Sequence, residues 1–422
     1  MPGLIEKFGA YIDRTAPEHP DRVRRILRAA FGVNGVAQRT ITKRDLPPCR
    51  RYVAAFTNDT MLRVLAHPDR CALVSLMLPC ELPDAFGVQP MCAEFYTSYL
   101  AGAAAEHSFI QRAEAEGIAE TFCSYHKALL GAAWSGVLPA PACIVNTSLI
   151  CDANNLTFRA LADYYGVPQY YVDVPPEKDE ESVTYVADQL RELGPFLTRC
   201  TGRKLDEDRL RENIARSRRT IETFRACIDA KRSVYLRNDM VSEMYEIMST
   251  HILLGTTGAE RYAQRLLRDL RAAPPTRGLR LLWVHTMPNW LRPLQETFKY
   301  SDRWQIIAGD LNFDALEDMD PDRPYESMAR RLVYSSMNGP ASHRIDRAAE
   351  MCRRMDIDGV ICFCHWGCKQ TAGAAAQIKS GLEAAGYPTL LLNGDGCDRR
   401  NTPEGQIMTR MHAFLEMLEA GK

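Results

Sequence analysis

Three cysteines fall within seven residues of one another in the segment VICFCHWGCKQ. They are Cys362, Cys364 and Cys368, and His365 and Trp366 stand between the second and the third. Thiolates and imidazoles are ligands that zinc and iron–sulfur clusters take from proteins, and a thiolate is also a nucleophile. The segment therefore predicts either a metal site or a group of cysteines buried in the core.

The residues alone leave three interpretations open. Cys362 and Cys364 lie in or just after an apolar run, and a buried cysteine commonly packs as a small hydrophobic residue. A structural zinc site prefers pairs of the form C-x2-C, so the x1 and x3 spacings found here fit it poorly. An iron–sulfur cluster can instead draw thiolates from separate loops and leave one iron open. Cys123 and Cys151 are then the other candidates, with 28 and 217 residues separating Cys123, Cys151 and Cys368.

The length and the composition limit which kinds of protein this chain can be. A chain of 422 residues exceeds what one hydrophobic core usually serves, which predicts two domains. Its 52 basic and 53 acidic residues nearly balance, which argues against a dedicated nucleic-acid-binding protein. The sequence shows neither a signal-peptide pattern nor a run of about 18 apolar residues, so we expect a soluble cytoplasmic protein without a membrane partner. In that compartment the fourteen cysteines should be reduced thiols.

Apolar runs that alternate with helical patterns predict the fold class. Strand-like runs occur at 71–78, 142–148, 169–174, 279–284, 304–308, 359–363 and 388–393. Segments long enough for helices separate them, and this rhythm is typical of parallel α/β sheets. Cys151 and Cys368 each come a few residues after such a run, at the sheet edge where α/β proteins bind ligands. We therefore predict an α/β protein with two Rossmann-like or flavodoxin-like parallel-sheet domains and helical additions.

The same pattern divides the chain into four parts. We predict a helical N-terminal arm over 1–70, a first α/β domain over 71–177, a helical connector over 178–273 and a second α/β domain over 274–422. The last part closes with a helix whose apolar face consists of Ile407, Met411, Phe414, Leu415 and Leu418. The two α/β parts are candidates for a distant duplication of one fold.

Five segments carry further motifs in a fixed order. They are LMLPCELPDAFGVQPM, TFCSYHKALLGAAWSG, SLICDANNLTFRALADYYGVPQYYVDVP, HWGCKQTAGA and YPTLLLNGDGCDRRNTPEGQIMTRMHAFLEML. Together they resemble the 2-hydroxyacyl-CoA dehydratase family from about residue 72 to residue 419, most of the chain. That family includes D-component-like dehydratase subunits, benzoyl-CoA reductase subunits and double-cubane cluster proteins.

The resemblance implies a [4Fe-4S] cluster held between the two domains by three cysteines. Carried over by motif, the ligands fall on Cys123, on Cys151 in the S-x-x-C-D context and on Cys368 in the W-G-C context. Glu81, in PCELPDAFG, becomes a candidate catalytic acid or base or a polar group that faces the cluster, with a favourable position at a helix start as its structural alternative. His365 becomes a candidate catalytic residue that donates to a cluster sulfur or a thioester carbonyl, with a purely structural histidine as the alternative.

Four more cysteines lie in or near the shared motifs and bear on the size of the cluster. They are Cys80, Cys92, Cys364 and Cys397. If some of these thiols also reach the site, a double-cubane cluster is the alternative to a single [4Fe-4S] cluster.

The activity that the resemblance implies is the removal of water from a 2-hydroxyacyl-CoA to give an enoyl-CoA. Enzymes of this family add one electron to the thioester carbonyl, and the resulting ketyl radical anion expels the 2-hydroxyl group. A separate ATP-dependent iron–sulfur activator supplies the electron, and the subunit pairs with a homologous second subunit or with a copy of itself. The alternatives are a related reductase and a non-catalytic electron-transfer or scaffold subunit.

Overall fold

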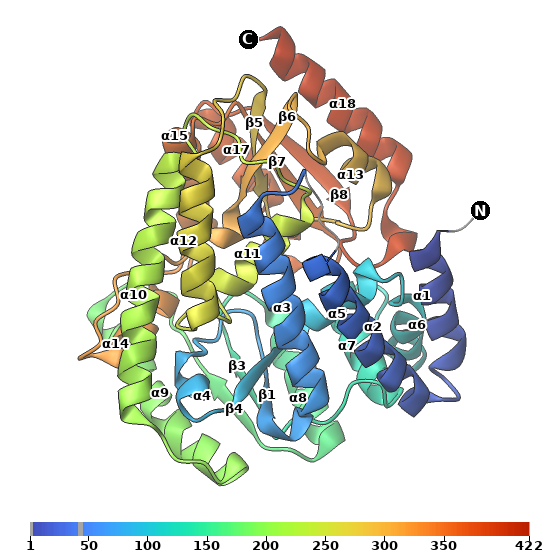
Figure 1. Ribbon diagram of the computed structural model, residues 1–422, viewed down its shortest axis with the longest axis vertical. Helices are drawn as coiled ribbons and strands as arrows, with labels where there is room; N and C mark the ends of the chain where they lie inside the picture. The colour runs from blue at the N-terminus through green and yellow to red at the C-terminus, as the bar shows by residue number, and fades with distance from the viewer. Residues whose placement is uncertain (1–2, 41–44, 422) are drawn as a thin grey trace.

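The computed structural model describes residues 3–40 and 45–421 and contains two four-stranded parallel sheets (Figure 1). The first has the strand order β2-β1-β3-β4, with β1 (Cys71–Val74), β2 (Gln89–Cys92), β3 (Cys143–Thr147) and β4 (Gln169–Val172). The second has the order β6-β5-β7-β8, with β5 (Leu279–Val284), β6 (Trp304–Gly309), β7 (Gly359–His365) and β8 (Thr389–Gly394). The predicted class, α/β with two parallel-sheet domains, is confirmed.

The two sheets share one strand order. In each, the first strand lies between the second and the third, and the fourth pairs with the third. Every neighbouring pair is parallel; β1 pairs with β3 through Ala72 and Cys143, and β5 pairs with β7 through Leu281 and Gly359. A duplicated α/β unit would leave such a repeated order, so the topology supports that interpretation.

The degree to which each strand is buried explains which strands could be predicted from the sequence. Strands β1, β3 and β5 are buried along their whole length and largely apolar, as expected of parallel strands with helices on both faces. Strand β2 was not predicted from the sequence, and its residues Gln89 and Pro90 are partly exposed. Because β2 lies at the edge of its sheet, Pro90 is tolerated there although it cannot donate a backbone hydrogen bond.

Helices cover the sheets and connect them. Before the end of the first sheet they are α1 (Leu4–Thr15), α2 (Pro20–Thr40), α3 (Pro48–Ala66), α4 (Glu81–Ala85), α5 (Ala93–Gly102), α6 (His107–Ala115), α7 (Ser124–Trp134) and α8 (Asp152–Tyr165). Between the sheets they are α9 (Glu180–Thr201), α10 (Glu207–Ala230), α11 (Val241–Thr250) and α12 (Thr257–Arg271). The later ones are α13 (Arg292–Phe298), α14 (Pro324–Val333), α15 (Ala341–Met355), α16 (Lys369–Ala372), α17 (Ala375–Ala384) and α18 (Glu404–Ala420). Short 3-10 helices are η1 (Pro68–Arg70), η2 (Asp310–Asn312) and η3 (Arg399–Asn401).

Of the predicted N-terminal arm, residues 1–2 and 41–44 lie outside the described residues. Within the described part of the chain, none of the helices combines the length and the apolar character needed to span a membrane.

The long helices α10 and α12 run side by side along one flank of the molecule, past both sheets (Figure 1). Each begins with a capping side chain: Asp206 accepts a hydrogen bond from the Arg209 N–H, and Thr256 accepts one from the Ala259 N–H. Helix α10 packs against α4 in the first half and against α15 in the second. This flank is therefore one of the structures that hold the two sheets together.

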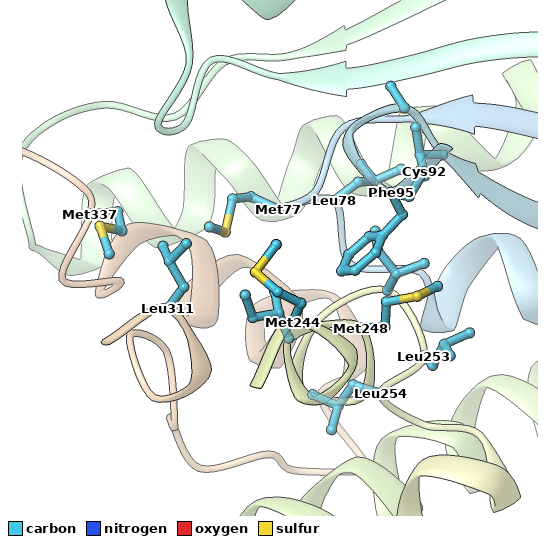
Figure 2. Packing of buried hydrophobic residues seen from close by; sticks show 14 of the residues in the cluster. Met77, Leu78, Cys92, Phe95, Met244, Met248, Leu253, Leu254, Leu311 and Met337 are labelled. Carbon is cyan, nitrogen blue, oxygen red and sulfur yellow. The ribbon is translucent and has the colours of Figure 1, made fainter. Parts of the chain in front are cut away.

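Side chains from both halves meet in one hydrophobic core. Figure 2 shows Met77, which follows β1, near Met244 of α11, with Leu311 of η2 and Met337 on the same side of the cluster. All four side chains are buried. Methionine is flexible and polarizable, so it fills the irregular gaps that arise where two layers meet. The two halves therefore pack through a continuous apolar contact near the carboxyl ends of β1 and β6.

A buried ion pair ties the N-terminal helices to this core. Arg50 of α3 donates to Glu243 at 2.6 Å and to Glu246 at 2.9 Å, both on α11. Tyr262 of α12 also donates to Glu246. Burying these charges is tolerated because each has a charged or hydrogen-bonding partner.

Candidate functional site

The candidate residues lie at the carboxyl edges of the two sheets. Connections leave the first and third strands of each sheet toward opposite sides, and this switch point is where open α/β sheets bind ligands. Cys151 follows β3 and Cys368 follows β7, the third strand of each sheet. Glu81 follows β1 and His285 follows β5, the first strand of each. The fold thus places candidate residues of the two halves at equivalent positions.

The loop that carries Cys368 touches the backbone of Cys123. Gly367 has a φ of +80°, and a Cβ added there would lie 2.8 Å from the Cys123 nitrogen and 2.9 Å from its Cα. Glycine alone readily combines this backbone conformation with so close an approach. The glycine of the W-G-C motif therefore lets a loop of the second half reach the start of α7, where Cys123 is the N-cap residue.

The thiols of Cys123, Cys151 and Cys368 lie near enough to one another to interact electrostatically. Burial raises the pKa of Cys123 well above the usual thiol value, and electrostatic interactions with Cys151 and Cys368 raise it further. Burial likewise raises the pKa of Cys151, with smaller contributions from Glu94 and Cys368. None of the fourteen cysteines forms a disulfide. The protein alone therefore keeps Cys123 and Cys151 protonated at neutral pH, whereas a bound metal would ionise them.

His365 lies against Cys123. Its Nε2 is 3.3 Å from Cys123 Sγ, and its Nδ1 accepts a hydrogen bond of 2.9 Å from the backbone N–H of Gly396. Burial lowers the pKa of His365 and outweighs the opposite effect of Asp395. A neutral imidazole that accepts at Nδ1 carries its proton on Nε2, so Nε2–H donates to sulfur. Cys123 Sγ is therefore the hydrogen-bond acceptor for the Nε2–H of His365.

A second histidine, His126, lies against Cys151. Its Nε2 is 3.4 Å from Cys151 Sγ. Burial lowers the pKa of His126 to about 3, with a smaller contribution from His365, so the ring is neutral. Its Nδ1 is buried and has no hydrogen-bond partner among the described residues. His126 was not predicted as a site residue, although it follows Cys123 by three residues, the spacing that brings side chains together on a helix.

The residue before Cys151 is held in a strained conformation. Ile150 has a φ of +74°, a region that β-branched residues rarely adopt. Such outliers persist only where the surrounding structure imposes them, and they concentrate at functional sites. The turn at Ile150 separates β3 from α8 and leaves Cys151 as the N-cap residue of that helix.

The segment GDGCD, residues 394–398, braces the site. The carbonyl oxygen of Gly396 accepts hydrogen bonds from the Tyr125 hydroxyl at 3.0 Å and from Trp290 Nε1 at 2.9 Å. Asp395 accepts a hydrogen bond from Ser124, the neighbour of Cys123. This bracing role was not predicted from the sequence. The position of the segment at the end of the last strand was the signal that could have indicated it.

His285 is a further buried residue at the switch point of the second sheet. It has a φ of +77°, and its backbone N–H donates to Asp310 Oδ1 at 2.7 Å. The centre of its ring lies 6.5 Å from that of His365. Burial, followed by electrostatic interactions with Arg344 and His365, lowers the pKa of His285 well below its usual value. This neutral histidine was not predicted as a site residue, although it directly follows the predicted strand 279–284.

Glu81 is engaged in a buried ion pair. Arg331 of α14 donates to its two oxygens at 2.6 and 3.1 Å, and Ser217 of α10 donates at 2.8 Å. The carboxylate is fully buried. These contacts join the first half of the chain to the second, which favours the structural alternative for Glu81 over a role in proton transfer.

The four additional thiols fall into two groups. Cys397 packs with Cys123 in one group of buried hydrophobic residues, and Cys364 interacts electrostatically with Cys368. Cys80 and Cys92 instead interact with each other. Cys397 and Cys364 are therefore the better placed of the four for a larger cluster.

The thiols and imidazoles of the candidate site are compatible with an iron–sulfur cluster. Among residues 3–40 and 45–421, no group of three or more His, Cys, Asp or Glu side chains is placed to hold one ion. A [4Fe-4S] cluster presents its irons at separate corners, so its thiolates need not converge on one point. Two of the three thiols have a neutral imidazole at hydrogen-bonding distance, and such contacts to sulfur are typical of cluster sites.

Comparison with known proteins shows the family. The family model described as 2-hydroxyglutaryl-CoA dehydratase, D-component, matches residues 75–418. The chain therefore belongs to this family, as the motifs predicted.

Three curated relatives are similar at low identity. The alpha subunit of (R)-2-hydroxyglutaryl-CoA dehydratase from Acidaminococcus fermentans is 22% identical over 67% of this chain and 61% of its own length. The alpha subunit of lactoyl-CoA dehydratase from Anaerotignum propionicum is 22% identical over 81% of this chain and 89% of its own length. A subunit of benzoyl-CoA reductase from Thauera aromatica is 22% identical over 74% and 79%, respectively. The match thus spans less than two thirds of the Acidaminococcus protein.

Proposed function

We propose that this chain is the iron–sulfur subunit of a 2-hydroxyacyl-CoA dehydratase, which removes water from a 2-hydroxyacyl-CoA to give an enoyl-CoA. The observation that carries the proposal is the meeting of Cys123, Cys151 and Cys368, which come from separate segments in both halves. Membership of the dehydratase family supports a [4Fe-4S] cluster as the group that these cysteines bind. When bound, such a cluster supplies one electron to the thioester, so that the hydroxyl group can leave without an acidic proton at C3.

The chain's own residues would hold and shield this cofactor. Cys123 and Cys151 stand at the N-termini of α7 and α8, where the helix dipole favours a negatively charged thiolate. His365 would donate its Nε2–H to the Cys123 sulfur and so offset part of its charge. Cys123 is only 7% exposed, so this side of the site excludes water.

Partner proteins would complete the activity. The three relatives are all named as subunits, which supports a complex with a homologous second subunit or with a second copy of this chain. We propose that the electron arrives from a separate ATP-dependent iron–sulfur activator. The complex would work in the cytoplasm, where the free thiols of this chain remain reduced.

Anaerobic purification tests the cofactor. We expect a brown protein with about four irons and about four acid-labile sulfides per chain. Stoichiometric zinc without sulfide would contradict the proposal, whereas about twice the iron would identify the double-cubane alternative.

An anaerobic assay tests the activity. The protein is mixed with activator, ATP and Mg²⁺, each omitted in turn, and enoyl-CoA is followed across a panel of 2-hydroxyacyl-CoA thioesters. Many product molecules should form per electron, because the electron returns to the cofactor at the end of each cycle. Full activity without the activator would contradict electron injection, and consumption of two electrons per product would identify a reductase.

A further inference from the structure

A polar cleft of about 210 Å³ opens beside the Cys368 loop. Its walls are the first residues of α15 and the residues that follow Cys368. The charged side chains that line it are Arg344 and Lys369, and the described lining residues include no carboxylate. Met337, also in its wall, belongs to the apolar core that the two halves share (Figure 2). The charged side chains on its walls are therefore both cations, and each has a carboxylate nearby: Asp310 beside Arg344 and Asp152 near Lys369.

Arg344 is the buried cation of this cleft, with 3% of its surface exposed. Asp310 Oδ2 accepts from its Nε at 2.8 Å and lies 2.7 Å from its Nη2. Its Nη1 is buried and has no hydrogen-bond partner within residues 3–40 and 45–421. Leaving such a donor unpaired is costly, so a ligand that accepts from it gains affinity.

The start of α15 adds further donors to the same cleft. Pro340 and Ala341 line the cleft, and Pro340, the N-cap residue, has no side chain that could cap the helix. The first amides of a helix and its dipole attract anions when no side chain satisfies them. Lys369 also lines the cleft; its side chain is 82% exposed, and its Nζ lies 3.9 Å from Asp152 Oδ2.

The cleft is connected to the candidate cluster site. Asp310, which holds Arg344, also accepts the backbone N–H of His285 through its other oxygen. The ring of His285 neighbours that of His365, which contacts Cys123. On the opposite wall, Lys369 directly follows a candidate ligand cysteine. The cleft therefore adjoins the loop that carries Cys368.

The geometry points to this cleft as the subsite for an anionic oxygen group of the thioester substrate. That group is either a carboxylate at the end of the acyl chain or a phosphate of coenzyme A. Both present the acceptor oxygens that an arginine N–H, helix amides and a lysine bind. The inference rests on the proposed function, because it takes the ligand to be an acyl-CoA.

Calorimetric binding to the anaerobically purified full-length protein tests the subsite without turnover. The probes are glutaryl-CoA, pentanoyl-CoA, which has the same chain length without the carboxylate, and coenzyme A. Glutaryl-CoA should bind about tenfold more tightly than pentanoyl-CoA, as expected for one charge-assisted hydrogen bond. The preference for glutaryl-CoA over pentanoyl-CoA should fall only about threefold in Lys369→Gln, because the contribution of a solvated side chain is small. It should fall further in Arg344→Lys, which keeps a cation beside Asp310 but loses the planar fork.

A matched control is Lys204→Gln, an exposed lysine in the loop between α9 and α10, which should leave all three affinities unchanged. Equal losses for all three ligands in the cleft variants, with no preference for glutaryl-CoA, would support the anion site and assign it to a phosphate of coenzyme A. Neither a preference nor an effect of the cleft variants would overturn the subsite. Failure of every coenzyme A compound to bind would overturn the proposed function itself.

Discussion

The backbone N–H of Gly396 determines which nitrogen of His365 faces Cys123. It donates to Nδ1 at 2.9 Å, so the remaining proton of the neutral ring lies on Nε2, 3.3 Å from the Cys123 sulfur. A loop after the last strand thereby fixes the direction of a hydrogen bond to a candidate ligand. Hydrogen bonds to ligand sulfurs are among the factors that set the reduction potential of an iron–sulfur cluster.

Replacing His365 should therefore change the reduction potential. His365→Leu removes the donor and should lower the potential by roughly 60 mV, a tenfold change for a one-electron couple. His365→Gln keeps an N–H donor and should recover part of the shift. Redox titration followed by electron paramagnetic resonance checks both variants, and wild-type potentials in both would show that the histidine does not act on the cluster.

Serine at Cys123, Cys151 or Cys368 should abolish or strongly reduce iron binding, because each change removes one thiolate ligand. Iron and sulfide analysis of anaerobically purified variants is the measurement. Matched controls are three other buried cysteines, which should keep their iron at a cost of about 1 kcal/mol in stability when changed to alanine: Cys71, Cys227 and Cys352.

Two outcomes would revise this ligand set. Normal iron content in Cys368→Ser would remove the second half of the chain from the site. Loss of half of the iron on replacing Cys397 or Cys364 would indicate the double-cubane cluster instead.

Gly367→Ala should separate the two loops that meet at Cys123. The added methyl group would collide with the backbone of Cys123 at 2.8 Å, so we expect reduced iron content. Gly386→Ala is the matched control, because its φ of +93° imposes a similar backbone strain while nothing lies within 4 Å of the added Cβ. It should cost about 1 kcal/mol and keep its iron. Equal iron loss in both variants would mean that strain, and not the contact with Cys123, is the cause.

Removing the Glu81 carboxylate should destabilise the protein, because it leaves Arg331 buried without its charged partner. We expect Glu81→Gln to lower the free energy of unfolding by about 3 kcal/mol. The double variant Glu81→Gln/Arg331→Met should regain most of this loss. Denaturant titration measures both. A double variant with recovered stability but without dehydratase activity would instead support a catalytic Glu81.

Glu106 should make stability depend on pH. Burial raises its pKa from 4.5 to about 7, against the opposite effect of Arg399. Because the folded protein holds this proton more tightly than the unfolded chain, the contribution of Glu106 is complete below pH 4.5 and is lost as the pH rises through about 7. The loss is at most about 3 kcal/mol.

Glu106→Gln isolates this contribution. Unfolding free energies at about pH 5 and about pH 7.5 should decline less in the variant than in the wild type. The control Glu116→Gln, an exposed residue after α6 that pairs with Arg112, should keep the wild-type pH dependence. Identical declines in Glu106→Gln and the wild type would show that Glu106 has an ordinary pKa.

The sheets could be predicted where burial makes a strand apolar throughout. The run CALV of β1 is buried on both faces, and hydrophobicity alone indicated it. The apolar face of α18 was also predicted correctly, since Ile407, Met411 and Phe414 are buried at helical spacing. β2 was not predicted, because Gln89 and Pro90 are residue types that are uncommon in strands and only pairing with β1 defines it.

The site was less accessible from the sequence. Cys151 and Cys368 are 217 residues apart, so motifs shared with a family, and not spacing, indicated that they act together. The PCELPD motif indicated Glu81, but its partner Arg331 stands 250 residues later, and only the fold brings the two into an ion pair. His285 could not be distinguished from an exposed histidine, because its burial depends on elements that pack against it from elsewhere in the chain.

The three candidate ligands do not belong to one half of the molecule. Cys123 and Cys151 come from the first half and Cys368 from the second, so a group bound by all three would act as a tether that encloses more than half of the chain. Such a tether restricts the unfolded chain, and binding free energy of this kind becomes folding free energy. Removing a group bound by all three cysteines would then lower the free energy of unfolding, even though the apolar core and the Glu81–Arg331 ion pair still join the two halves.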